Sequence, residues 1–350
     1  MKHLAVSLLA AAALSAGLLI TPAALAQSDQ AAPALAAAAA RPMVGVDVYA
    51  KSNYSAADVT LYGDRMFSYI KRVLKANAVS IVWNLYDKTA TSDTVSATKT
   101  TMSAANVGIL TRIAERDGLK VVYRPLIMVT GGNRGPWEGN IAPASQAKWF
   151  ASYYKAELPY LKVAQQFKIA EFVVETEMHK MNASRGWAGY FKRLAKVYRG
   201  VLSYASWDRD YFPPTHLLPV SAVGLDFYEA MPKLSGSASE AQVLAGWEGW
   251  FKRVPASLLR RTTMQEVGIA AASGSYADPA ALAGRGRLDQ NVQANWFTAA
   301  CKVVRKYDMR GVFFWKVDLS DNPDHPTSAL SVFEGRKGAA AIASCAKIVG

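Results

Sequence analysis

Eight short apolar runs alternate along this chain with longer segments whose apolar residues recur at helical spacing. The runs cover residues 43–49, 79–86, 119–129, 170–178, 200–206, 222–228, 262–268 and 311–318. Such alternation of strand-like and helix-like segments predicts a parallel sheet. Eight repeats favour closure into a (β/α)₈ TIM barrel of the α/β class over an open, doubly wound sheet. No G-x-G-x-x-G motif follows the first run, which argues against a dinucleotide-binding fold.

The segments between the runs predict the helices that would surround the barrel. In the first of them, Phe67, Ile70 and Leu74 belong to an apolar stripe on one helix face. The expected helices cover residues 58–76, 101–117, 144–167, 184–198, 239–259, 289–307 and 335–348. Residues 208–219, after the fifth run, contain prolines and show no long helical pattern. One barrel accounts for nearly all of a chain of 350 residues, so no second domain is predicted.

The N-terminal segment has the pattern of a secretory signal. Lys2 and His3 precede an apolar run at 4–20, and residues 24–26 fit an A-x-A cleavage site. A membrane anchor is the alternative, but the run is short for a span of about 20 residues. We expect a signal peptide at 1–26, a flexible Ala-rich lead at 27–41 and a single catalytic domain at 42–350. The expected location is secreted or periplasmic, with no stable membrane insertion.

Two cysteines, Cys301 and Cys345, fall in helical patterns near the C-terminus. Export makes a disulfide between them plausible, and two buried free thiols are the alternative.

The chain carries a net charge of +13, which raises the question of nucleic acid binding. Its lysines and arginines are spread over several expected helices rather than gathered in one tract, so we predict a solvated basic surface and no nucleic acid partner. Weak attraction to an acidic polymer or an anionic cell envelope stays open. We expect a monomer.

Two glutamates close strand-like runs: Glu177 the fourth and Glu266 the seventh. In a (β/α)₈ barrel the carboxyl ends of the strands form the mouth of the active site. Side chains alternate along a strand, so Glu175 is expected to face the same way as Glu177, one layer deeper. A buried glutamate needs a partner, and Arg124 on the third run is the candidate. The alternative is that Glu175 is the catalytic residue and Glu177 lies on the surface.

Three stretches of the sequence resemble glycoside hydrolase family 113, the endo-β-mannanase family of the clan A barrels. They are WEGNI at 137–141 with WFASY at 149–153; FVVETEM at 172–178 with Trp187 and YRGVLSY at 198–204; and VGLDFY at 223–228 with QEVG at 265–268 and FFW at 313–315. The order and spacing hold from about residue 43 to about residue 320.

This resemblance implies that Glu177 is the general acid/base and Glu266 the nucleophile of a retaining hydrolase. In such an enzyme the two carboxyl groups lie about 5–5.5 Å apart. The acid must stay protonated near neutral pH, and the nucleophile must stay ionised, with Tyr228 as a candidate hydrogen-bond donor.

Sugar binding requires aromatic faces and planar hydrogen-bonding groups. The predicted substrate contacts are Trp315, Tyr228, Asp226, Trp137, Arg124, Trp83, Asn84, Glu175 and Asp47, with Tyr49 and Trp207 as further candidates. Of these, Trp315 and Trp137 also match positions of the family. Metal and cofactor chemistry is not expected, because the four histidines lack a ligand spacing such as H-E-x-x-H and no phosphate loop is present.

Three positions depart from the family pattern and leave the substrate open. Thr176 stands where many clan A enzymes have Asn, Glu175 where the pattern usually has Gly, and Arg124 begins R-P-L where the family commonly has K-P-H. We therefore expect a polysaccharide or oligosaccharide substrate, β-1,4-mannan first. The alternatives are another β-glycan or an envelope exopolysaccharide, and, outside enzymes, a non-catalytic carbohydrate-binding barrel.

Overall fold

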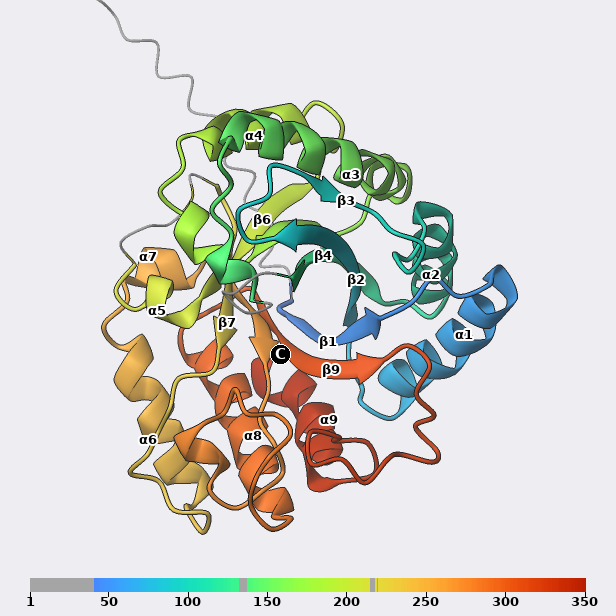
Figure 1. Ribbon diagram of the computed structural model, residues 1–350. Coiled ribbons are helices and arrows are strands. Elements are labelled where there is room, and N and C mark those ends of the chain that lie inside the picture. Colours follow the sequence, from blue (N-terminus) through green and yellow to red (C-terminus); the bar gives the residue numbers. More distant parts are fainter. Residues whose placement is uncertain (1–40, 132–136, 215–217, 219) are drawn as a thin grey trace, which may run out of the picture. The chain divides into compact units, whose positions relative to one another are not determined.

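Eight parallel strands close into a barrel in the computed structural model, which confirms the predicted (β/α)₈ fold (Figure 1). The structure describes residues 41–131, 137–214, 218 and 220–350, so the predicted signal peptide and most of the Ala-rich lead lie outside the described residues. Residues 41–350 form one compact unit. No helix among the described residues is both long and apolar enough to cross a membrane.

The barrel strands follow one another in chain order around the sheet, and β1 pairs with both β2 and β9 to close it. They are β1 Met43–Ala50, β2 Ala78–Thr89, β4 Lys120–Gly131, β5 Glu171–Thr176, β6 Val201–Trp207, β7 Val223–Phe227, β8 Thr262–Val267 and β9 Gly311–Asp318. A two-residue strand that the sequence did not predict, β3 (Val95–Ser96), pairs antiparallel with β2. The fourth and seventh barrel strands are therefore β5 and β8.

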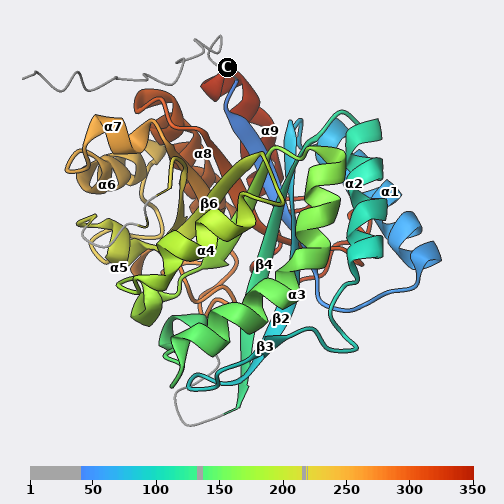
Figure 2. The same ribbon diagram turned by 90° about the horizontal axis from the view of Figure 1, so that it is seen from above.

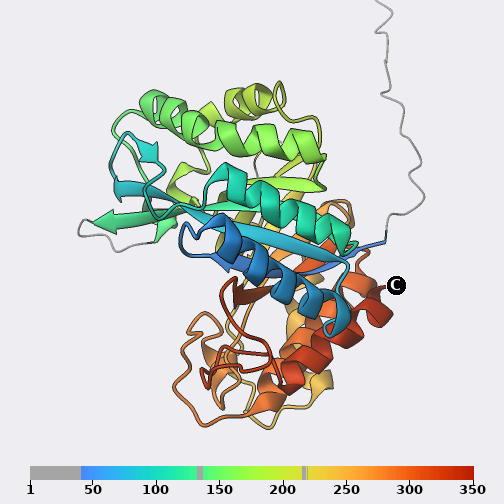
Figure 3. The same cartoon turned by 90° about the vertical axis from the view of Figure 1, so that its right-hand side faces the viewer.

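The strands β2 and β4 have 12 residues each and run past their neighbours at the end where β3 is added (Figures 2 and 3). This is the carboxyl end of the parallel strands, so the extension raises one side of the barrel mouth.

The helices surround the strands (Figure 1). They are α1 Ala56–Arg72, α2 Ala104–Arg116, α3 Gln146–Phe167, α4 Gly186–Leu194, α5 Asp208–Tyr211, α6 Glu240–Phe251, α7 Ala256–Leu259, α8 Gln290–Lys306 and α9 Lys337–Val349, with 3₁₀ turns η1 Glu138–Asn140, η2 His179–Met181 and η3 Ser275–Ala277.

Two regions of the helical layer have local explanations, one that departs from the expectation and one that agrees with it. The helix expected at 239–259 is divided into α6 and α7, because Pro255 lacks the N–H that a helix interior requires and stands just before α7. After β6 only the four-residue α5 forms, as the absence of a helical pattern there predicted.

Trp83 shows how the barrel and helix layers divide the side chains of a strand. It is fully buried and stacks on Tyr160 of α3, with the ring centroids 4.5 Å apart. Its neighbour Asn84 instead donates a hydrogen bond to the hydroxyl of Tyr49 on β1 (2.6 Å). Because successive strand residues point to opposite faces, the two cannot share a site. The prediction that Trp83 contacts substrate is wrong: it packs between barrel and helix.

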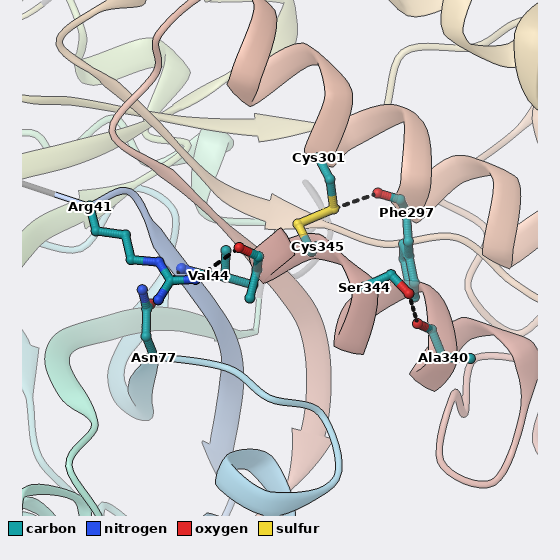
Figure 4. The surroundings of a disulfide bond; sticks show 9 residues. Arg41, Val44, Asn77, Phe297, Cys301, Ala340, Ser344 and Cys345 are labelled. Carbon is teal, nitrogen blue, oxygen red and sulfur yellow. Dashed lines mark hydrogen bonds between the residues drawn. A yellow bond between two sulfur atoms is a disulfide. The ribbon is translucent and has the colours of Figure 1, made fainter. Parts of the chain in front are cut away.

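A disulfide joins Cys301 on α8 to Cys345 on α9, and both residues are fully buried (Figure 4). Arg41, at the start of the described chain, donates a hydrogen bond to the carbonyl oxygen of Ala346 on the same last helix (2.9 Å). The closing helix is therefore held covalently to its neighbour and non-covalently to the strand that opens the barrel.

Removal of this disulfide gives a test of its contribution to stability. The bond closes a loop of 44 residues, and restricting a loop of that length in the unfolded chain is worth about 3–4 kcal/mol. We expect the double variant Cys301→Ala/Cys345→Ala to lose about that much free energy of unfolding in urea titrations. Ser344→Ala, one residue away on α9, is the control and should change little. Equal stability of the double variant and the parent chain would contradict the expectation.

Candidate active site

A cavity of about 650 Å³ opens at the carboxyl ends of the strands. Its lining contains both predicted catalytic glutamates, Glu177 and Glu266, and three of the predicted substrate contacts, Trp137, Tyr228 and Trp315. Segments from six barrel strands or the loops after them contribute to it. The remaining lining residues are Leu126, Glu138, Trp207, Asp208, Arg209, Glu229, Ala230, Ala277, Asp278, Pro279, Ala280 and Leu282.

Glu177 directly follows β5 and has a left-handed backbone, with φ of 49°. Its N–H donates to the carbonyl oxygen of Ala205 on β6 (2.8 Å), and its carboxyl oxygen Oε2 accepts from the indole Nε1 of Trp137 (2.8 Å). Burial raises its pKa well above the usual value, and the charges of Glu266 and Glu138 add to the rise. This carboxyl group is therefore set up to hold a proton near neutral pH.

Glu266, on β8, has the opposite surroundings. The guanidinium of Arg124 lies 2.6 Å from its Oε1, and the hydroxyl of Tyr228 donates to its Oε2 (2.6 Å). Its side chain is 11% exposed. A neighbouring cation and a donated hydrogen bond both stabilise the ionised form of a carboxyl group. Two glutamates in one cavity thus have different surroundings: one lies beside an indole and other carboxyl groups, and the other lies against a guanidinium and a phenol.

Arg124, on β4, is fully buried below the cavity and pairs with carboxylates from three strands. Its Nη2 lies 2.7 Å from Asp226 on β7 as well as 2.6 Å from Glu266, and its Nη1 lies 3.9 Å from Asp47 on β1. Burial alone would lower the pKa of this guanidinium, but the three acidic neighbours raise it above its ordinary value. Arg124 therefore stays charged.

The predicted ion pair between Arg124 and Glu175 is wrong. Glu175 Oε2 accepts instead from the backbone N–H of Met178 (3.0 Å), and burial raises the pKa of its carboxyl group to about 8. The pairing of β5 with β6 shifts register between Val173 and Thr176, and the chain then turns at Glu177. The regular alternation that would place Glu175 below Glu177 is lost there. Glu175 holds the turn that carries Glu177.

The other predicted contacts also lie outside the cavity lining. Asp47 and Asp226 are fully buried beside Arg124, and burial raises the pKa of both carboxyl groups well above the ordinary value, with Arg124 opposing the rise. Asn84 is hydrogen-bonded to the hydroxyl of Tyr49, and the ring centroid of Tyr49 lies 6.2 Å from that of Trp315. These residues support the aromatic and charged groups that reach the cavity.

Two tryptophans meet beside Glu177. The rings of Trp137 and Trp207 lie edge to face, with centroids 4.7 Å apart, and His179 packs against Trp207 while its Nδ1 lies 2.7 Å from Asp210. Gly139 allows this arrangement, because a Cβ there would lie 2.3 Å from the Trp137 ring. Trp137 is therefore fixed both by its own turn and by β6.

Several cavity residues were not predicted as site residues. Glu138 belongs to the WEGNI stretch that resembles the family, but no role was predicted for it from the sequence. No role was predicted for four other lining residues either: Asp208, Arg209, Glu229 and Asp278. They lie in turns and loops after strands, where no periodic pattern indicates the direction of a side chain. Their one signal was position, since each follows a predicted strand end. Within the described residues, no group of three or more His, Cys, Asp or Glu side chains could hold a metal ion.

A parallel (β/α)₈ barrel with two glutamates in one cavity at its mouth is an arrangement typical of glycoside hydrolases. The family model for Glycoside Hydrolase Family 113 matches residues 61–329, and the chain belongs to this family. It is therefore a hydrolase that acts on O-glycosidic bonds. No curated protein matches the chain in sequence.

Solved structures share the fold at low sequence identity. The structure of a complex of a GH113 beta-1,4-mannanase superposes with a TM-score of 0.74 and 17% identity, covering 88% of this chain and 99% of that one. The GH113 beta-mannanase AaManA from Alicyclobacillus acidocaldarius, in complex with ManMIm, gives 0.70 and 16%, covering 89% and 98%. GH5_18 from Streptomyces cattleya, in complex with GlcNAc, gives 0.55 and 14%, covering 88% and 80%.

Removal of the central guanidinium should destabilise the fold in a pH-dependent way. Arg124→Met leaves three buried carboxyl groups without their cation, which costs about 3–5 kcal/mol at neutral pH. Without Arg124 the folded pKa values of Asp47 and Asp226 lie further above the unfolded values, so the variant loses stability as pH rises and regains part of it on acidification. Urea unfolding at neutral and mildly acidic pH measures both effects.

The control is Arg116→Met, which breaks a surface pair with Asp64 and Asp117. Exposed pairs contribute little, so its stability should stay close to that of the parent chain. If both variants lost the same free energy of unfolding, the buried ion pairs would contribute no more to stability than the surface pair.

Proposed function

We propose that this chain is an exported, retaining glycoside hydrolase that cleaves β-linked polysaccharide, with β-1,4-mannan as the first substrate. The observation that carries the mechanism is the contrast between Glu177 and Glu266 in one cavity: burial and like charges favour the protonated form of the first, and the second pairs with Arg124 and accepts a hydrogen bond from Tyr228. Membership of family 113 and the likeness to solved GH113 beta-1,4-mannanases support the choice of mannan.

In this mechanism Glu266 attacks the anomeric carbon while Glu177 gives its proton to the oxygen of the leaving sugar. The bond to that oxygen breaks as a bond between the anomeric carbon and a Glu266 oxygen forms. Glu177, now ionised, takes a proton from water, and the water oxygen displaces Glu266 from the anomeric carbon. Two displacements at one carbon retain its configuration. Trp315, on the cavity wall, offers an aromatic face to the sugar that is attacked.

Export is proposed from two observations. The sequence has the pattern of a signal peptide at 1–26, and the disulfide between Cys301 and Cys345 is of the kind that persists in oxidising compartments. N-terminal sequencing of the protein recovered from its own cell envelope or medium tests this, and we expect the mature chain to begin at Gln27.

The two glutamate roles are separable by leaving group. On mannan, Glu177→Gln and Glu266→Gln should each lower kcat/KM by about 10³-fold or more. On a nitrophenyl β-glycoside the leaving group departs without a proton, so formation of the glycosyl-enzyme should stay fast in Glu177→Gln and be lost in Glu266→Gln. Burst kinetics and NMR of the first-formed anomer provide the measurement.

Glu115→Gln, an exposed carboxylate on α2, is the matched control and should be fully active. If both glutamate variants lost activity on mannan and on the nitrophenyl glycoside alike, the assignment of an acid role to Glu177 and a nucleophile role to Glu266 would be contradicted. Activity on xylan, β-glucan or an acidic exopolysaccharide but not on mannan would keep the mechanism and change the substrate. Carbohydrate binding without product release would favour the binding-barrel alternative.

The indole donor of Trp137 should set the alkaline limit of activity. Its hydrogen bond stabilises the ionised form of Glu177, so removing it raises the pKa of this carboxyl group further. We expect Trp137→Phe to move the alkaline limb of the kcat/KM profile upward by about one pH unit. Trp207→Phe keeps the donor and is the control. A downward shift in Trp137→Phe would contradict the assignment of Glu177 as the acid.

A further inference from the structure

The cavity is acidic although the chain is basic. Its lining carries six carboxyl groups and one guanidinium, that of Arg209, in a chain of net charge +13. The six carboxyl groups belong to Glu138, Glu177, Asp208, Glu229, Glu266 and Asp278. Hydrolysis of a neutral sugar chain requires two carboxyl groups. The other four therefore call for a separate explanation.

Three of the six have partners or states that the mechanism and fold explain. Glu266 is paired with Arg124, Glu177 is set up to be protonated, and Asp208 accepts a hydrogen bond from the backbone N–H of Tyr228 (3.1 Å). Asp278 is exposed in the loop after β8, where water can solvate it.

Glu138 and Glu229 differ from these. Neither side chain forms an ion pair or a hydrogen bond with another side chain in the described part of the chain, and the partner of Glu138 is its own backbone amide. Burial raises the pKa of each to about 7, so each is partly ionised near neutral pH. Glu138 follows Trp137 and Glu229 follows Tyr228, the two residues that hydrogen-bond the predicted catalytic glutamates.

Arg124 opposes the rise in the pKa of Glu138 and Arg209 opposes that of Glu229, but neither cation forms a direct ion pair with these groups among the described residues. Arg124 faces three other carboxylates below the cavity floor. The guanidinium of Arg209 lies 5.1 Å from the centroid of the Trp207 ring, over its face. A partly buried carboxylate without a direct ion pair is costly, whereas an ammonium ligand would supply a charge-assisted hydrogen bond.

We infer that this cavity takes a sugar with a protonated amine, a hexosamine that lacks the N-acetyl group, next to the cleaved bond, and that Glu138 and Glu229 are the carboxylates that recognise it. The inference rests on the proposed function, since it names the substrate class of the same site. An N-acetyl group would remove the positive charge, and a hydroxyl would replace it with a neutral donor. The cavity would therefore select for a positive charge at the sugar carbon that carries the amine.

Binding measurements separate this inference from hydrolysis. The probes are a β-1,4-linked glucosamine tetramer, its fully N-acetylated form and β-1,4-mannotetraose, each titrated against the Glu266→Gln variant so that no cleavage occurs. Quenching of tryptophan fluorescence reports binding, because Trp137, Trp207 and Trp315 line the cavity. Near neutral pH, where Glu138 and Glu229 are partly ionised, and at low salt, we expect the glucosamine tetramer to bind about tenfold more tightly than its N-acetylated form. Raising the ionic strength should reduce this preference.

Further substitutions test whether Glu138 and Glu229 cause the preference for the glucosamine tetramer. Glu138→Gln and Glu229→Gln, each in the same background, should reduce it by about threefold or more, while Glu115→Gln removes one negative charge far from the cavity and should leave it unchanged. Equal or weaker binding of the glucosamine tetramer, or a preference that survives both substitutions, would overturn the inference.

Hydrolysis assays of the parent chain distinguish failure of the amine-site inference from failure of the proposed hydrolase function. Cleavage of mannan with no preference for the amine keeps the proposed function and rejects the amine site. If no β-glycan or glucosamine polymer is cleaved, the proposed function fails, and the binding preference alone then decides on the amine site.

Discussion

One buried guanidinium holds together the centre of this barrel. Arg124, from β4, contacts carboxylates on β1, β7 and β8, and its Nη1 also donates to the carbonyl oxygen of Gln265 (3.2 Å). Strands from opposite parts of the sheet are thus joined through one fully buried side chain, where an unpaired charge of either sign is costly. The same guanidinium lies 2.6 Å from a carboxyl oxygen of Glu266 in the cavity. Stability of the barrel and chemistry at its mouth therefore share one group.

The two site glutamates show how the same side chain acquires different properties from its neighbours. Glu177 lies beside an indole and near other carboxyl groups, whereas Glu266 lies against a guanidinium and a phenol. The difference comes from residues around the two glutamates: Trp137 and Tyr228 in the cavity lining, and Arg124 buried below it. Transfer of only the two glutamates to another barrel would not reproduce it, because these neighbours would be missing there.

The sequence was sufficient to predict the barrel and the ends of its strands, because burial makes apolar residues recur at a regular spacing along strands and helices. The runs ending at Glu177 and Glu266 were located to within two residues of the observed β5 and β8. The directions of single side chains were not predictable in the same way. Trp83 points to α3 rather than to the mouth, and a register shift in β5 turns Glu175 away from Arg124. Glu138 and Glu229 lie in turns, where no period exists.

The backbone of Glu177 has a consequence for how this chain can change over time. Its positive φ suits glycine, whereas a residue with a Cβ is disfavoured there by about 1 kcal/mol or more. The carboxyl group adds a further cost, since it is buried close to other acidic groups. A descendant that no longer needed hydrolysis could become more stable by a single replacement at this position. Glutamate at residue 177 is thus a sensitive marker, since only selection for chemistry acts to keep it there.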